Sequence, residues 1–274
     1  MSIRFALNRT CAPQLPLDGF IALATSVGVR AVEIRNDIEG REFHDGTPAA
    51  DVRARLDAAG LEVASVNALQ RFNEWNATRA REARAIIAYA AALGAPGVVL
   101  CPVHNEDNGW TGAEAERNLR DGLRQLRPIL QDHGVTGYVE PLGMRGSTMK
   151  RQDMAAAAVS DIDGWDAYQL CYDTFQFFRC GDTALVPERI GLAHMSGIAR
   201  TDLGPAALTE PDRGLIFVGD RVGNIAQLRT LKAAGYTGFV SMEPFSPEVQ
   251  TDPDLVAHLR ASLDYVSALL NAAA

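Results

Sequence analysis

A single unit recurs along this chain: a helical pattern closes on a glycine, and a short apolar, β-branched run begins a few residues later. A glycine just past a helix accepts the left-handed backbone conformation that ends it. The run that follows is typical of a strand buried on both faces, and helices that alternate with such strands build parallel sheets. The unit occurs at residues 28–36, 60–69, 94–103, 134–142 and 235–245.

The same pattern elsewhere in the chain extends this set. We expect eight strands, near residues 4–8, 31–36, 62–68, 97–103, 136–141, 168–174, 190–196 and 238–244. The clearest helical patterns between strands lie at 77–93 and 113–131, the weakest lies at 180–189, and a last helix is expected at 253–270. The stretch 197–221, rich in Gly, Pro and Asp, indicates a long loop after the seventh strand.

Eight strand–helix units are compatible with two folds. A doubly wound sheet usually carries a glycine-rich phosphate loop after its first strand. Here that place holds NRTCAPQLPL, and no GxGxxG or GxxxxGK[ST] motif occurs where a strand meets a helix. A (β/α)8 barrel needs about 250 residues, and this chain has 274 without a linker-like stretch. We therefore predict an α/β fold, a single-domain (β/α)8 TIM barrel over residues 1–274.

Charge and composition indicate which partners to expect. The net charge is −8 and Lys and Arg do not cluster, which is a poor match for nucleic acid or for an acidic membrane surface. No apolar run reaches about 18 residues, and the N-terminus has no signal-like apolar region. The four cysteines are scattered without a CxxC motif. We expect a cytoplasmic protein with reduced thiols that binds a small molecule, and neither nucleic acid nor membrane; the number of subunits stays open.

Polar side chains gather at the predicted strand ends, which is where the active sites of (β/α)8 barrels lie. Taken alone, each is more often a surface, capping or core residue. Burying three carboxylates together without a cation, however, would cost several kcal/mol per ion. An oxygen-rich set with one imidazole suits Mn²⁺, Mg²⁺ or Co²⁺, and Zn²⁺ is also compatible. The last four strands end in Glu140, Asp173, His194 and Glu243, and the earlier strand ends carry Asn8, Glu33, Arg35, Asn67 and His104. We predict one divalent metal ion on the first four of these.

Two of the predicted ligands stand in mirrored settings, Tyr138-Val-Glu-Pro141 and Ser241-Met-Glu-Pro244. Proline donates no backbone hydrogen bond and keeps the residue before it out of helical geometry. Each strand should therefore stay extended through its glutamate and then stop. This projects both carboxylates at the mouth of the barrel, where they can flank one metal ion and its ligand.

Nearly the whole chain resembles the xylose-isomerase-like superfamily of sugar isomerases and epimerases, and within it the bacterial 2-keto-myo-inositol (inosose) isomerases. The resemblance rests on AVEIRND (31–37), SVNALQRFNEWNATR (65–79), YVEPLG (138–143), CYDTFQFF (171–178), LAHMSG (192–197), DRGLIFVGDRVGNI (212–225) and SMEPFSPE (241–248). It implies the barrel, a single divalent metal on the Glu, Asp, His and Glu of these segments, and a role in carbohydrate metabolism such as inositol catabolism.

The chain departs from that family at two positions. Relatives often carry His three residues after the metal-binding Asp, where this chain has Gln176, and an acidic residue three after the metal-binding His, where it has Gly197. Gln can hydrogen-bond a substrate hydroxyl but is neither a cation nor a proton donor near neutral pH. We therefore predict that Gln176 contacts the substrate and not the metal.

Other residues are weaker candidates for substrate binding. The resemblance to sugar epimerases gives this role to Arg200, six residues after the metal-binding His. Asn67 and His104 end strands, and Trp75 follows the third strand in a loop, where an aromatic ring can cover an apolar face of a sugar. For each of them, packing or a solvated surface position is the competing interpretation.

The family resemblance implies a metal-dependent isomerase or epimerase that acts on a small polyol ketone or ketose, such as 2-keto-myo-inositol. A carboxylate, Glu140 or Glu243, would remove the proton beside the carbonyl, and the resulting enediolate would be reprotonated elsewhere. A metal-dependent dehydratase or lyase on the same barrel remains an alternative, as does a non-catalytic barrel. A nuclease of this superfamily would need more histidine ligands and a DNA-binding surface, which five His and a negative charge do not favour.

Overall fold

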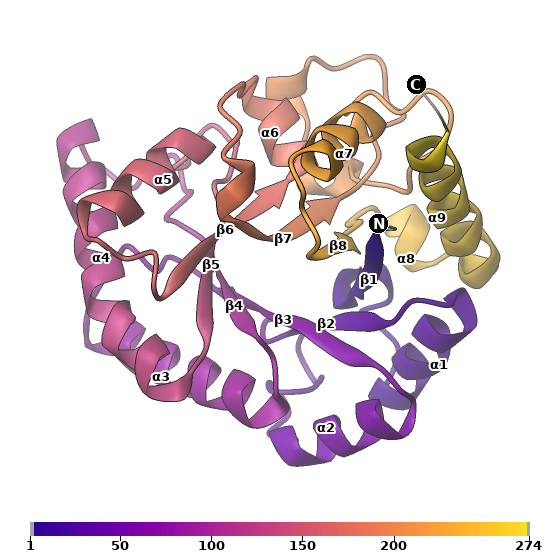
Figure 1. Ribbon diagram of the computed structural model, residues 1–274, viewed down its shortest axis with the longest axis horizontal. Coiled ribbons are helices and arrows are strands. Elements are labelled where there is room, and N and C mark those ends of the chain that lie inside the picture. Colours follow the sequence, from indigo (N-terminus) through magenta and orange to yellow (C-terminus); the bar gives the residue numbers. More distant parts are fainter. Residues whose placement is uncertain (1–2, 273–274) are drawn as a thin grey trace.

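The computed structural model describes residues 3–272 and consists of a closed parallel barrel surrounded by helices (Figure 1). The strands follow one another around the barrel in chain order, and β8 closes it by pairing in parallel with β1. Their bounds are β1 Arg4–Asn8, β2 Ala31–Arg35, β3 Glu62–Leu69, β4 Gly97–Leu100, β5 Thr136–Val139, β6 Tyr168–Asp173, β7 Ile190–Met195 and β8 Phe239–Met242. The predicted (β/α)8 TIM barrel is confirmed.

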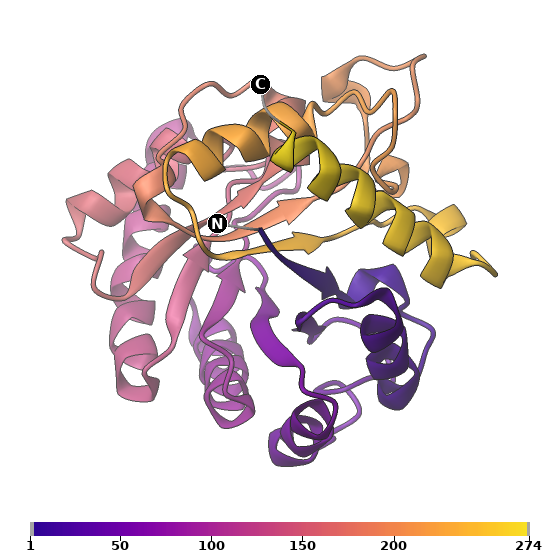
Figure 2. The ribbon, with the colours of Figure 1, turned by 45° about the vertical axis from the view of Figure 1, so that its right-hand side comes forward.

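The helices lie on the outside of the strands, and Figure 2 shows the same ring from another side. Their bounds are α1 Leu17–Val27, α2 Ala49–Ala58, α3 Ala77–Leu93, α4 Gly112–His133, α5 Gln152–Asp161, α6 Thr174–Cys180, α7 Asn224–Ala233, α8 Pro247–Gln250 and α9 Leu255–Asn271. Within residues 3–272, no helix combines the length and apolar character needed to cross a membrane.

The glycines that punctuate the sequence act as predicted. Gly94 ends α3 with φ of 74° and Gly134 ends α4 with φ of 63°, both in the left-handed region. Each backbone N–H bonds back to the last turn of its helix, and the chain is turned toward the next strand. These glycines are why the unit can repeat with such short connections.

The expected helix near 180–189 is wrong in position. Helix α6 begins directly after β6, because the Asp173 side chain accepts hydrogen bonds from the backbone N–H groups of Phe175 and Gln176. It ends at Cys180, where Gly181 adopts a left-handed conformation. Residues 187–189 form only a short 3-10 turn. Local capping, which helical periodicity does not record, moved this helix toward the N-terminus.

The barrel interior has its own apolar cluster, separate from the layer between strands and helices. It combines small side chains with a few large ones, namely Ala6, Ala31, Ala64, Ala68, Val99, Cys101, Tyr138, Leu142, Cys171, Leu192 and Phe239. Most of these side chains fill the barrel interior, as in other barrels of this type, whereas Cys101 and Leu142 reach its C-terminal mouth.

Candidate active site

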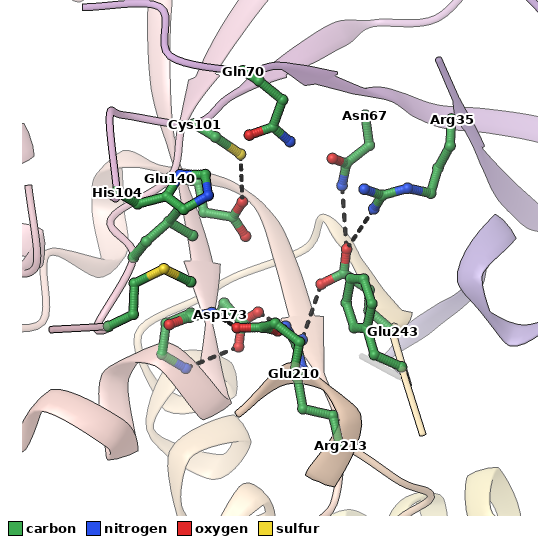
Figure 3. Close-up of a pocket in the computed structure, with 14 residues that line it drawn as sticks. Arg35, Asn67, Gln70, Cys101, His104, Glu140, Asp173, Glu210, Arg213 and Glu243 are labelled. Atoms are coloured by element: carbon green, nitrogen blue, oxygen red, sulfur yellow. Dashed lines mark hydrogen bonds and ion pairs between the residues drawn. The ribbon is translucent and has the colours of Figure 1, made fainter. Parts of the chain in front are cut away.

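A cavity of about 140 Å³ opens at the C-terminal ends of the strands (Figure 3). Its walls come from nearly every strand end and from the loop after β7. The lining residues are Arg35, Asn67, Gln70, Cys101, His104, Glu140, Leu142, Met144, Asp173, Gln176, Glu210, Arg213, Glu243 and Phe245. Charged and amide side chains dominate this list, so the cavity suits a polar ligand.

The four predicted metal ligands lie together, and three of them, Glu140, Asp173 and Glu243, line this cavity. Glu140, Asp173, His194 and Glu243 each offer a ligand atom, and these atoms all lie within 4.8 Å of one another. All four residues are buried. The sheet ladder runs up to each glutamate: the N–H of Glu140 donates to Leu100, and that of Glu243 donates to Met195. Both Glu-Pro segments therefore end their strands in the way that the prolines predicted.

Guanidinium groups surround the carboxylates. One Nη of Arg213 lies 2.7 Å from Oδ2 of Asp173 and 2.9 Å from Oε2 of Glu243. Arg35 approaches the other oxygen of Glu243 at 3.1 Å, and Asn67 donates to that oxygen at 3.3 Å. Figure 3 shows these groups converging on Glu243 from two sides. The neighbouring cations partly offset the negative charge of the cluster.

The protein groups alone do not give these carboxylates equal acidity. Burial would raise the pKa of Glu140, but the adjacent His194 outweighs it and holds that pKa below its usual value. Burial raises the pKa of Asp173 although Arg213 opposes it. Burial also raises the pKa of Glu243 to about 7, against the opposing charges of His194 and Arg213. Two of the three carboxylates therefore resist ionisation in this environment.

The donor set fits a divalent cation. Three carboxylates and one imidazole offer ligand atoms within 4.8 Å of one another, and a 2+ ion would offset the burial that raises the pKa of Asp173 and Glu243. Oxygen-rich sets with a single histidine are usual for Mn²⁺, Mg²⁺ and Co²⁺ and are accepted by Zn²⁺. The chemistry of the side chains thus agrees with the predicted metal.

Two cysteines lie closer to this cluster than the sequence indicated. Sγ of Cys171 lies 3.5 Å from Nδ1 of His194. Sγ of Cys101 lies 3.3 Å from Oε2 of Glu140. Burial raises the pKa of both thiols well above its usual value, so they border the cluster as neutral groups.

The predicted substrate-binding residues separate into two groups. Asn67, His104 and Gln176 line the cavity. Arg200 instead lies on an exposed surface, where it pairs with Asp202 and Asp212. Trp75 lines a different hollow beside Trp110 and packs partly against the helix layer. The predicted substrate contacts of Arg200 and Trp75 therefore find no support in this geometry, because the loops carry both side chains away from the mouth.

Several lining residues were not anticipated as part of the site. Glu210 comes from a short 3-10 turn, Glu210–Asp212, in the loop after β7, and it bonds to Gln176 and Arg213. The structure also explains why position 197 is a glycine: a Cβ there would lie 2.2 Å from the carbonyl oxygen of Leu215. The acidic residue that relatives often have at this position would not fit against this loop.

Comparison with known proteins gives a consistent result. Residues 21–266 match the sequence model of a family described as xylose isomerase-like TIM barrel. Over 231 residues the chain is 29% identical to an inosose isomerase from Halalkalibacterium halodurans, and the match covers 81% of this chain and 80% of that protein.

Solved structures with the same fold cover the chain almost completely. A xylose isomerase domain-containing protein from Salmonella typhimurium LT2 has 26% identity and a TM-score of 0.88, and the match covers 99% of this chain and 100% of that one. The IolI protein with a bound zinc atom has 21% identity and a TM-score of 0.87, with 98% and 100% covered. A D-psicose 3-epimerase with D-tagatose, from Clostridium cellulolyticum H10, has 14% identity and a TM-score of 0.75, with 98% and 100% covered.

Proposed function

We propose that this chain, which belongs to the xylose isomerase-like TIM barrel family, is a divalent-metal-dependent isomerase or epimerase of a small polyol ketone or ketose. The observation that carries the proposal is the convergence, at the ends of β5 to β8 and beside a polar cavity, of four side chains that could hold a metal ion. The similarity to an inosose isomerase makes 2-keto-myo-inositol the first substrate to test and inositol catabolism the first pathway to consider.

In this proposal Glu140, Asp173, His194 and Glu243 hold the metal ion. When bound, the ion would supply Lewis-acid stabilisation of negative charge on substrate oxygens. Mn²⁺, Mg²⁺ or Co²⁺ suits the oxygen-rich set best. The zinc atom of the IolI protein, which has the same fold, keeps Zn²⁺ among the candidates.

The chain's own carboxylates would carry out the proton transfers. A buried carboxylate can remove the proton beside the substrate carbonyl when the negative charge that develops on the substrate oxygens is stabilised, which leaves an enediolate. Glu140, whose pKa is held below its usual value, is ionised near neutral pH and so has an oxygen free to accept a proton. Glu243, with a pKa of about 7, is suited to hold and return one near neutral pH. In Figure 3 these two residues enter the cavity from different sides.

The cavity walls favour an uncharged, hydroxyl-rich ligand. The guanidinium groups of Arg35 and Arg213 are already bonded to carboxylates, so neither is a free partner for a phosphate. The remaining polar walls include the neutral amides of Asn67, Gln70 and Gln176. Amides both donate and accept hydrogen bonds, which suits hydroxyl groups.

The first test is turnover in D₂O with inososes and ketohexoses as substrates. We expect an isomeric product that has lost no water and carries deuterium at the carbon beside the carbonyl, because the proton passes through a solvent-exchangeable carboxyl group. A dehydrated product would support the dehydratase alternative instead. A hydride shift between carbons would give an isomerised product free of solvent deuterium and would reject proton transfer by these carboxylates.

The second test replaces the two glutamates one at a time. Glu140→Gln and Glu243→Gln each keep a ligating oxygen but cannot accept a proton. We expect kcat to fall by about 10²–10⁴-fold, the usual contribution of general acid–base catalysis, while part of the metal stays bound. Glu248→Gln, an exposed glutamate on α8, is the matched control and should keep its activity. Near-normal turnover in both site variants would contradict the assignment.

A further inference from the structure

We propose that Glu33 is a positioning residue for the metal: it holds the His194 ring so that Nδ1, and not Nε2, faces the ion. This inference rests on the metal-dependent function proposed above and adds a residue to which no role has been given. It concerns the orientation and protonation of a ligand, which can be measured without any substrate.

The first observation is where the His194 ring points. Its Nδ1 lies 2.8 Å from Oε1 of Glu140 and 3.3 Å from Oε2 of Glu243, both proposed metal ligands. Its Nε2 lies 3.1 Å from Oε2 of Glu33. Because the two nitrogens point to different partners, only Nδ1 faces the metal-binding set.

The second observation is how Glu33 is held. It lies on β2, is fully buried, and reaches His194 across the interior from a strand that is not a neighbour of β7. Asn8 donates to its Oε1 at 3.1 Å, and Ser65 donates to its Oε2 at 2.5 Å. Hydrogen bonds at both oxygens fix the carboxylate against the ring, so Glu33 is placed to act on His194 and does not touch the cavity.

The chemical consequence follows from what a carboxylate can do. An ionised carboxylate only accepts hydrogen bonds, so the ring nitrogen that faces it carries the proton. When a metal ion binds, the proton on Nδ1 leaves, Nε2 keeps its hydrogen toward Glu33, and the lone pair of Nδ1 becomes available to the ion. Histidine ligands are commonly oriented by a carboxylate in this way, which fixes the tautomer and makes the ligating nitrogen more basic.

The most direct test is long-range ¹H–¹⁵N NMR of the zinc-loaded wild-type protein, with Zn²⁺ as the diamagnetic probe. We expect the His194 ring to show a metal-bound Nδ1 and a protonated Nε2. A metal-bound Nε2 would overturn the inference even if the protein is active. A wild-type chain that takes up no metal would overturn this inference together with the metal dependence of the proposed function.

A variant pair tests whether Glu33 matters for binding. The amide of Glu33→Gln can donate to Nε2 and so favours the tautomer that places hydrogen on Nδ1. We expect Mn²⁺ and Zn²⁺ to bind about 10–100-fold more weakly, the usual effect of removing such a partner, with a mixed His194 tautomer in the NMR spectrum. Ser65→Ala, which leaves the carboxylate but removes one of its donors, should show a smaller loss and serves if the first variant does not fold.

The matched control is Glu42→Gln. Glu42 is also a buried glutamate, 2% exposed, but it pairs with Arg9 outside the cavity. We expect this variant to lose stability while its metal affinity and its His194 tautomer stay as in the wild type. Equal metal affinity in Glu33→Gln, Ser65→Ala and the wild type would overturn the inference while leaving the proposed catalytic activity intact.

Discussion

At the residue scale, the side chains of the cavity hold one another in place. Gln176 is a clear case: its Oε1 accepts from the backbone N–H of Gly143, and its Nε2 donates to Glu210. It therefore joins the segment after β5 to the loop after β7. Where relatives often have a histidine, this chain has a neutral bridge between two walls of the cavity, which explains how the site tolerates the departure from the family pattern.

We expect Gln176→Ala to raise KM or lower kcat by about 3–10-fold, as the loss of one hydrogen bond would predict, with the metal content unchanged. Arg200→Ala is the informative comparison, because Arg200 is exposed and bonded to Asp202 and Asp212 outside the cavity. From this geometry it should leave both constants near their wild-type values. Steady-state kinetics with parallel metal analysis measures both. Metal loss in Gln176→Ala would place that residue in the coordination shell and contradict us.

At the element scale, β6 continues directly into α6, and one residue makes the junction. Oδ1 of Asp173 caps α6 through the N–H groups of Phe175 and Gln176, while Oδ2 faces Arg213 and the metal-binding set. A helix N-terminus also carries a partial positive charge that favours a carboxylate. The same side chain therefore serves the fold and the site through different oxygens.

These two roles can be separated by substitution. Asn is as good a helix cap as Asp, whereas Ala is not, and the difference is about 1 kcal/mol. We expect Asp173→Asn and Asp173→Ala to lose metal alike, but the Ala variant to unfold with a free energy about 1 kcal/mol lower than the Asn variant. Chemical denaturation in the presence of a chelator measures this. Asn76→Ala, which removes the cap of α3, should lose similar stability and keep its metal; equal stability of the two Asp173 variants would refute the capping role.

At the scale of the whole molecule, the two halves of the barrel contribute differently. The proposed ligands all come from β5 to β8, whereas Asn8, Glu33, Arg35 and Asn67 reach the centre from β1 to β3. A metal ion would thus tie four strand ends together, and the first three strands would support it. Binding to the folded state alone stabilises a protein, by about 2.7 kcal/mol at a ligand concentration 100-fold above Kd.

We expect chelator treatment to lower the thermal unfolding midpoint, because it removes the stabilising metal ion.

We also expect metal affinity to be weaker at low pH than at high pH. Burial would lower the pKa of His194, but the nearby carboxylates Glu243 and Glu33 raise it well above its usual value, and the pKa of Glu243 is raised to about 7. Protons on these groups must leave when the metal binds. Affinity should therefore fall as pH drops through about 7 and rise above it. Calorimetric titration with Mn²⁺ at several pH values tests this, and a flat profile would contradict it.

The sequence by itself determined the fold and the four proposed ligands. Repeated helix–Gly–strand units set the local geometry, and in a closed parallel barrel every strand end meets at one mouth. Polar residues at 140, 173, 194 and 243 were therefore bound to converge. The hydrogen-bond partners of these side chains could not be predicted in the same way, since periodicity carries no information about contacts across the interior.

Only the tertiary structure decided what surrounds those ligands. The path of the loop after β7 brings Glu210 and Arg213 to the cavity and leaves Arg200 outside. The closed barrel brings Glu33 onto His194 from strands that are not neighbours. The physical reason is the same in each case: strand-end positions follow from local backbone geometry, whereas loop paths and side-chain pairs depend on packing between segments that are distant in sequence.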